Sequence, residues 1–193
     1  MSHLILKAGL VAGYATLEGV EGVEDGLAGD LVGSAPLASR WPGGAFLRIP
    51  QSQEKDAKLG DMISAYGNPV VSQRFRDALE LLIEKSRVEF LPVGVRDRKG
   101  APVSGAFYIM RALDVEDVID VAASAGELNE NDNENLIVWE ELVVKPGVGA
   151  IFRPRRLVGG VAMVREDVAA RLRAITPKLV GLSLLAPGDY SGN

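Results

Sequence analysis

Residues 72–113 constrain the fold more than any other part of the sequence, because they combine a capped helix with two apolar strands. Ser72 is a good N-cap, and the apolar residues after it follow the spacing of a helix that buries one face. These residues are Phe75, Ala78, Leu79, Leu82 and Ile83. Residues 88–95 are typical of a strand in which Pro92 and Gly94 indicate an edge or a bulge. After a turn at 97–100, residues 106–113 are apolar on both faces, which predicts a central strand.

The other periodic segments predict short strands and one more helix. Residues 115–122 fit a helical stripe, with a strand extension as the alternative, and residues 126–135 form a polar loop. Runs of strands interrupted by two helices predict an α+β fold, a mostly antiparallel sheet with two principal helices packed on it. The remaining strands are expected at 4–6, 45–49, 136–144, 150–153, 161–164 and 179–185, and the second helix at 166–175.

The length of 193 residues favours one domain. Residues 1–65 are rich in glycine and weak in periodicity, and the stretch 18–34 is typical of a long surface loop. We expect this glycine-rich part, with its extended segments, to be integrated in the same domain as a core formed by residues 66–193.

The chain has no cysteine and one histidine, which excludes disulfide scaffolds, thiol nucleophiles, zinc ribbons and His-rich metal sites. His3 stands where chains are commonly frayed or pinned to a sheet edge, so we do not expect it to be catalytic. A net charge of -5 argues against general nucleic-acid binding. Apolar runs fall short of the roughly 18 residues that cross a bilayer, and a basic leader is missing, which favours a cytoplasmic location.

Searches for sequence motifs of catalysis or cofactor binding give no catalytic, cofactor or metal site. The phosphate-binding pattern GxxxxGK and the hydrolase pattern GxSxG are absent, and Gly147-Val148-Gly149 is expected to be a turn. Residues 129–135 resemble a calcium loop in their alternating oxygen ligands. They lack its glycine and terminal glutamate, which favours a solvated loop.

Charge is segregated along the second half of the chain. From Asp114 to Glu141 there are ten acidic residues and no Lys or Arg. From Lys145 to Lys178 there are eight basic residues and only two acidic ones. Solvated faces, salt bridges within the domain and a partner-facing surface all explain such blocks. A catalytic pair among Asp114, Asp117 and Asp120 is a further alternative, although no apolar pocket separates their pKa values. The ten acids are Asp114, Glu116, Asp117, Asp120, Glu127, Glu130, Asp132, Glu134, Glu140 and Glu141.

Three stretches together resemble a family of bacterial immunity proteins from polymorphic toxin systems. Residues 67–79 resemble the family's "VxSxRFxxxL" helix start, residues 88–93 and 107–115 its "EFLPV…YYIxNxLxV" core, and residues 179–182 its closing "xTGxxF" strand. The resemblance covers residues 61–185. This chain departs from the pattern at Arg111 (Asn in the family), Arg165 (Ser) and Leu184 (an aromatic residue).

The resemblance implies a cytoplasmic protein of bacterial competition that binds and neutralises a cognate toxin by stoichiometric occlusion, without catalysis and without a cofactor. Its partner is then a protein toxin, such as a basic nuclease, and not nucleic acid or a membrane. The ten acids are the expected partner-binding residues if the toxin is basic. The alternatives are a regulatory binding module with another ligand and a hydrolase using Asp117 and Asp120.

Overall fold

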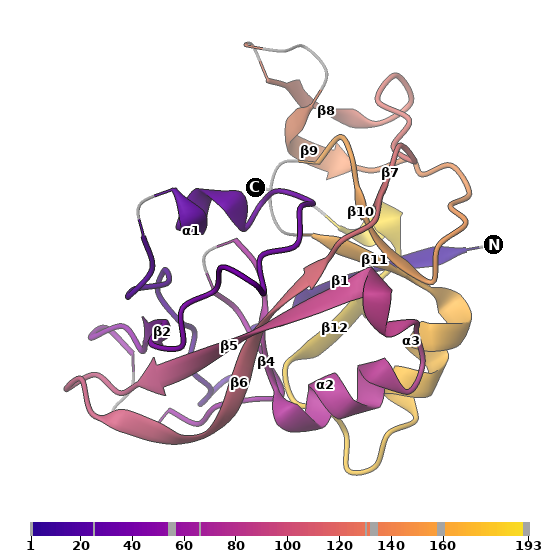
Figure 1. The fold of residues 1–193 in the computed structure, drawn as a ribbon. Helices are drawn as coiled ribbons and strands as arrows, with labels where there is room; N and C mark the ends of the chain where they lie inside the picture. Colours follow the sequence, from indigo (N-terminus) through magenta and orange to yellow (C-terminus); the bar gives the residue numbers. More distant parts are fainter. Residues whose placement is uncertain are drawn as a thin grey trace.

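The computed structural model describes residues 2–24, 26–53, 57–65, 67–129, 131, 135–157 and 161–190. Strands cover 36% of the chain and helices 15%, so the fold is α+β as expected. The strands form two mixed, largely antiparallel sheets and a separate hairpin (Figure 1). The single antiparallel sheet that the sequence suggested is therefore divided in two.

The first sheet has the strand order β12-β1-β11-β10-β7 and unites the two ends of the chain. All its neighbouring strands are antiparallel except β10 and β7. Its strands are β12 (Leu182–Leu185), β1 (His3–Ala8), β11 (Ala162–Arg165), β10 (Ile151–Pro154) and β7 (Val115–Glu116).

The second sheet has the order β2-β5-β6-β4-β3, in which only β2 and β5 are parallel. The predicted central strand is confirmed, because β6 lies between β5 and β4. The predicted bulge is confirmed between Val93 and Val95, whereas an edge position for this strand is wrong because β5 also pairs with β2. The strands are β2 (Phe46–Arg48), β5 (Val88–Arg96), β6 (Pro102–Ala112), β4 (Val70–Ser72) and β3 (Met62–Ile63).

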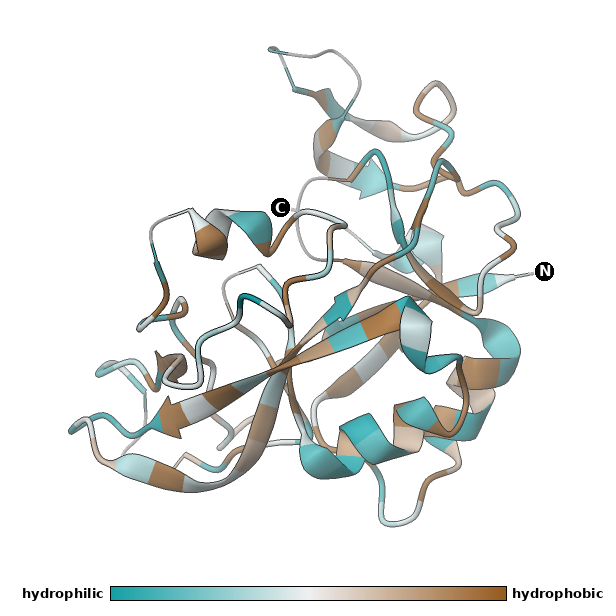
Figure 2. Ribbon diagram, viewed as in Figure 1, coloured by the Kyte–Doolittle hydropathy of each residue, from teal (hydrophilic) through white to brown (hydrophobic). Residues whose placement is uncertain are grey.

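Two helices of eight residues, α2 (Gln73–Glu80) and α3 (Glu166–Arg173), bury their apolar faces in the same hydrophobic cluster (Figure 1). This cluster also contains Leu6 of the first sheet and Met110 of the second, so it joins the sheets to the helices. Figure 2 shows hydrophobic stretches along the strands and alternating polar and apolar positions on α2 and α3. The shorter helices are α1 (Leu27–Asp30) and the 3-10 turns η1 (Lys85–Arg87) and η2 (Pro187–Asp189).

The N-cap of α2 is the one that the sequence predicts. The Phe75 amide donates to Ser72 Oγ at 3.2 Å, and the Ser72 hydroxyl donates to Asp61 Oδ1 at 2.8 Å. Removing this hydroxyl leaves a helix-terminal amide without its acceptor. We therefore expect Ser72→Ala to lower the free energy of unfolding by about 1 kcal/mol in urea denaturation. Ser104→Ala, in an exposed part of β6, is the matched control; equal stability of the two variants would contradict the cap's contribution.

At the start of α3, Arg165 forms a two-point ion pair with Asp167, with N–O distances of 2.5 and 2.9 Å. Hydrogen bonds from Arg165 lower the pKa of Asp167 to about 2. Because folding lowers the pKa of Asp167, its ionised carboxylate stabilises the folded state at pH values above the ordinary carboxyl pKa. This stabilisation is lost as the pH falls toward 2. Arg165→Gln should raise the pKa of Asp167 toward its ordinary value in an NMR titration of the carboxyl carbon, and an unchanged value would reject the pairing.

Two segments differ from their expected structure. The helix predicted at 115–122 is wrong, and the alternative of a strand is confirmed only for Val115–Glu116, because β7 pairs with β10. Val118 and Ile119 are buried under the first sheet. Part of the polar loop predicted at 126–135 is a strand instead: β8 (Ala125–Leu128) pairs with β9 (Leu136–Glu141). In residues 115–122 the burial of apolar side chains outweighs the helical spacing of the sequence. In residues 126–135 strand pairing outweighs the polar composition.

The glycine-rich segment packs on the outer face of the second sheet. Leu27, Leu31 and Leu37 are buried there in one cluster with Leu91 of β5. The expectation of a surface loop over residues 18–34 is therefore wrong for Leu27 and Leu31, although most residues between them and Leu37 are exposed.

A buried ion pair also holds this segment. Arg111 of β6 and Glu89 of β5 lie directly opposite each other in the register, are 1% and 8% exposed and are joined by a hydrogen bond from the guanidinium to the carboxylate. Arg111 donates to four backbone carbonyls, those of Asp30, Leu31, Gly33 and Ala35, at 2.7–3.2 Å. Glu89 accepts from the amides of Leu37 and Ala38, both at 2.7 Å. The pair thus replaces the hydrogen bonds that the loop backbone loses on burial.

Candidate partner-binding surface

The acidic segment, residues 114–141, leaves the first sheet after β7 and forms the β8–β9 hairpin, and the chain then returns to the sheet as β10. The hairpin projects from the body at the top of Figure 1. Trp139 and Leu136 of β9 are buried together with Ile5, Phe152 and Met163 of the first sheet, which anchors the base of the hairpin. The segment is therefore attached by an apolar cluster and exposes its polar side chains.

Four of the ten candidate acids form ion pairs or hydrogen bonds within the molecule. Asp114 pairs with Arg87 at 2.6 Å, and Asp120 with Lys145 at 3.6 Å. Asp117 accepts two hydrogen bonds from Arg156, at 2.8 and 3.0 Å. Glu116 accepts from the amides of Val148 and Gly149, at 3.0 and 2.7 Å. Two of these contacts are salt bridges between the acidic and the basic segments of the sequence.

These contacts also bear on the proposed hydrolase pair. The hydrogen bonds from Arg156 lower the pKa of Asp117, so this group stays ionised, whereas a general acid needs a raised pKa. Asp120 faces Lys145 and accepts from the Ala123 amide at 3.3 Å. Each carboxylate has a cation of its own, and this arrangement favours structure over acid–base catalysis.

Three other candidate acids are exposed to solvent. Glu127 on β8, and Glu140 and Glu141 on β9, are exposed, and none forms an ion pair with a described residue. Ala125 is opposite Glu141 in the register and Glu127 is opposite Val138, so the three carboxylates share one small hairpin. Glu130, Asp132 and Glu134 lie outside the described residues. Among the described candidate acids, the exposed ones without an ion pair are thus on the hairpin, and apolar Leu128 beside them is 37% exposed.

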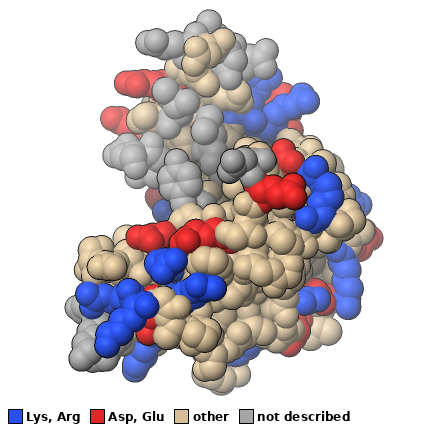
Figure 3. All heavy atoms as spheres, turned by 60° about the vertical axis from the view of Figure 1, so that its left-hand side comes forward, with Lys and Arg blue, Asp and Glu red and all other residues tan. Residues whose placement is uncertain are grey.

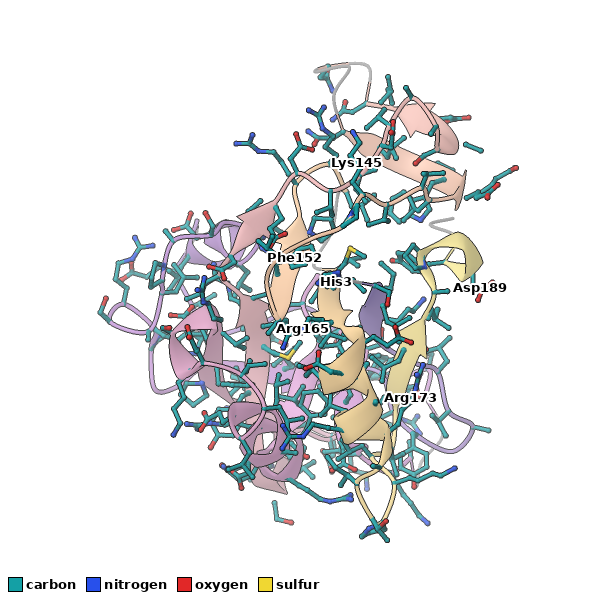
Figure 4. All side chains as sticks on the ribbon, turned by 90° about the vertical axis from the view of Figure 1, so that its right-hand side faces the viewer. His3, Lys145, Phe152, Arg165, Arg173 and Asp189 are labelled. Atoms are coloured by element: carbon teal, nitrogen blue, oxygen red, sulfur yellow. The ribbon has the colours of Figure 1, made fainter. Side chains whose placement is uncertain are left out.

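The other candidates from the sequence have structural surroundings. His3 is not at a frayed terminus: it is 5% exposed on β1, its Nε2 is 2.9 Å from the Gly149 carbonyl oxygen, and its ring meets Phe152 edge-on (Figure 4). The Gly147–Gly149 turn gives its amides to the Glu116 carboxylate, which would repel a phosphate. Within the described ranges, no group of three or more His, Cys, Asp or Glu residues could hold a metal ion.

The sequence reasoning missed the Arg111–Glu89 pair. A signal was present, because each residue interrupts an otherwise apolar strand and the two charges are opposite. A charge in a strand predicted to be central needs a buried partner, and the adjacent strand supplies one.

Comparison with known families gives one match. The sequence profile of the immunity protein family Imm11 matches residues 17–184, which extends further toward the N-terminus than the motifs quoted above. No curated protein matches the chain. None of the helices described is long and apolar enough to cross a membrane.

Proposed function

The chain belongs to the Imm11 immunity protein family, and from this membership we propose that it neutralises a cognate bacterial toxin by stoichiometric occlusion in the cytoplasm. Proteins of this family are typically non-catalytic. A cognate toxin is the partner that the family implies. The family match over residues 17–184 is the observation that carries the proposal.

We assign the contact with the toxin to the acidic hairpin, defined by Glu127, Glu140 and Glu141. These carboxylates form no ion pair with a described residue and project from the body, so they create a negative potential that steers a basic partner toward the surface. The acids at the base of the hairpin serve the fold instead, so the proposed surface is narrower than the ten residues of the acidic segment. Its charge fits a basic toxin, such as a nuclease.

Co-expression tests this function directly. The toxin encoded beside this chain should arrest growth when it is produced alone, and the wild-type chain should restore growth. If the chain does not restore growth of cells that produce this toxin, it belongs to the alternative class of regulatory binding modules.

A further inference from the structure

A groove of about 1070 Å³ lies at the end of the second sheet, away from the acidic hairpin. Three separate parts of the chain form its walls: the end of β2 with the residues after it, residues 57–59, and the turn between β5 and β6 with the start of β6. The β5–β6 turn is at the lower left of Figure 1 and the hairpin is at the top, so the two surfaces are distinct.

The rim of the groove is basic. Lys58, Arg98 and Lys99 line it, and none of them forms an ion pair with a described residue. Among the described residues of the lining, Asp97 is the one acid, and it accepts hydrogen bonds from the amides of Lys99 and Ala101, both at 2.8 Å, which shape the turn. Figure 3 shows basic side chains gathered over this lower part of the molecule. The groove therefore carries positive charge that the described part of the chain does not neutralise.

The floor of the groove is apolar. Leu59, Val103 and Phe107 line it, and Phe107, which is 8% exposed, belongs to the cluster under the second sheet. A ligand that fills the groove has to offer both negative groups for the rim and apolar groups for the floor. A free phosphate satisfies only the first requirement.

The size and the layout of the groove indicate a polypeptide. Its volume reaches the upper limit of roughly 300–1,000 Å³ that is usual for small-molecule pockets. Its cations come from separate segments along the rim, which matches carboxylates spaced along an extended chain. Nucleic acid would in addition meet the repulsion of a protein with a net charge of -5. We propose that this groove binds an acidic segment of a partner protein that interleaves carboxylates with apolar side chains.

Fluorescence anisotropy with the full-length chain tests the proposal. The probe is a labelled peptide of alternating glutamate and leucine, with a lysine–leucine peptide and single-stranded oligothymidine as comparison probes. Lys58→Glu with Lys99→Glu reverses two exposed charges on the rim. The matched control, Arg171→Glu with Lys178→Glu, reverses two exposed charges elsewhere and gives the same net charge.

We expect saturable binding of the acidic peptide, weakened by salt, and a loss of about tenfold or more in affinity for the rim variant but not for the control. No saturable binding, equal binding by the two variants, or preference for oligothymidine or the lysine peptide would overturn the proposal. Because this assay uses no toxin, its failure would leave the growth rescue unaffected, and the two proposals fail separately.

Discussion

Arg111→Met should lower the free energy of unfolding by about 3–5 kcal/mol, since it leaves the buried Glu89 carboxylate without its cation. It also removes the hydrogen bonds that Arg111 donates to four backbone carbonyls between Asp30 and Ala35. Urea denaturation measures the global effect. Hydrogen exchange at the Leu37 and Ala38 amides, which donate to Glu89, should accelerate by more than the global loss explains.

Arg171→Met, at an exposed position of α3, is the control and should stay within about 0.5 kcal/mol of the wild type. Replacing Arg111 and Glu89 together by Met tests whether the charges alone are responsible. We expect the double variant to remain destabilised, because the Gly33 and Ala35 carbonyls and the Leu37 and Ala38 amides still lose their hydrogen bonds. A loss below about 1 kcal/mol for Arg111→Met would contradict the fold account, because a broken buried pair costs more than that.

Reversing Glu127, Glu140 and Glu141 to Lys should slow association with a basic toxin by about one to two orders of magnitude at low salt. The three reversals move the net charge from -5 to +1 and place like charge opposite the partner. The dependence of the association rate on ionic strength should flatten or change sign. Stopped-flow or biolayer measurements across a salt series would show both effects.

The control for the hairpin reverses three exposed acids elsewhere in the chain, Glu18, Glu24 and Asp77, and reaches the same net charge. It should retain most of the association rate, because steering depends on charge near the interface. Equal slowing by the two variants would mean that net charge matters and the hairpin does not. Unchanged kinetics of the hairpin variant would reject this surface as the contact.

Local signals in the sequence predicted much of the fold. Ser72 with its apolar stripe fixed the start of α2, and the apolar residues around Ile109 placed β6 at the centre of its sheet. Gly181 in the closing motif also has a physical reason. It adopts φ +84°, and a Cβ there would collide with the Met62 carbonyl oxygen.

Tertiary contacts decided the parts that the sequence did not predict. The apolar residues of 115–122 have helical spacing, yet Val118 and Ile119 belong to an irregular segment because the first sheet buries them. The glycine-rich segment has weak periodicity, and its placement depends on long-range bonds to Arg111 and Glu89, which local patterns do not contain. The division of the strands into separate sheets could not be predicted either, because the apolar pattern of a strand does not specify which strand it pairs with.

The sequence predicted the candidate partner-binding surface only as the acidic segment 114–141, without separating its individual acids. Charge counting found the ten acids, but the counts do not distinguish Asp117, which pairs with Arg156, from Glu140, which is exposed without an ion pair to a described residue. Salt bridging within the domain and a partner-facing surface were posed as alternatives for the block. In the structure, salt bridges occupy the base of the hairpin, and we propose the partner surface for the exposed acids on its strands.

Titration of the purified toxin's activity with this chain tests the central claim most directly. Occlusion predicts that activity falls in proportion to the chain added and ends at a fixed molar ratio that does not change with incubation time. The hairpin variant should require a longer time or a higher concentration to reach the same end point. Toxin activity that is unaffected, or that small amounts of the chain abolish progressively over time, would contradict neutralisation by binding.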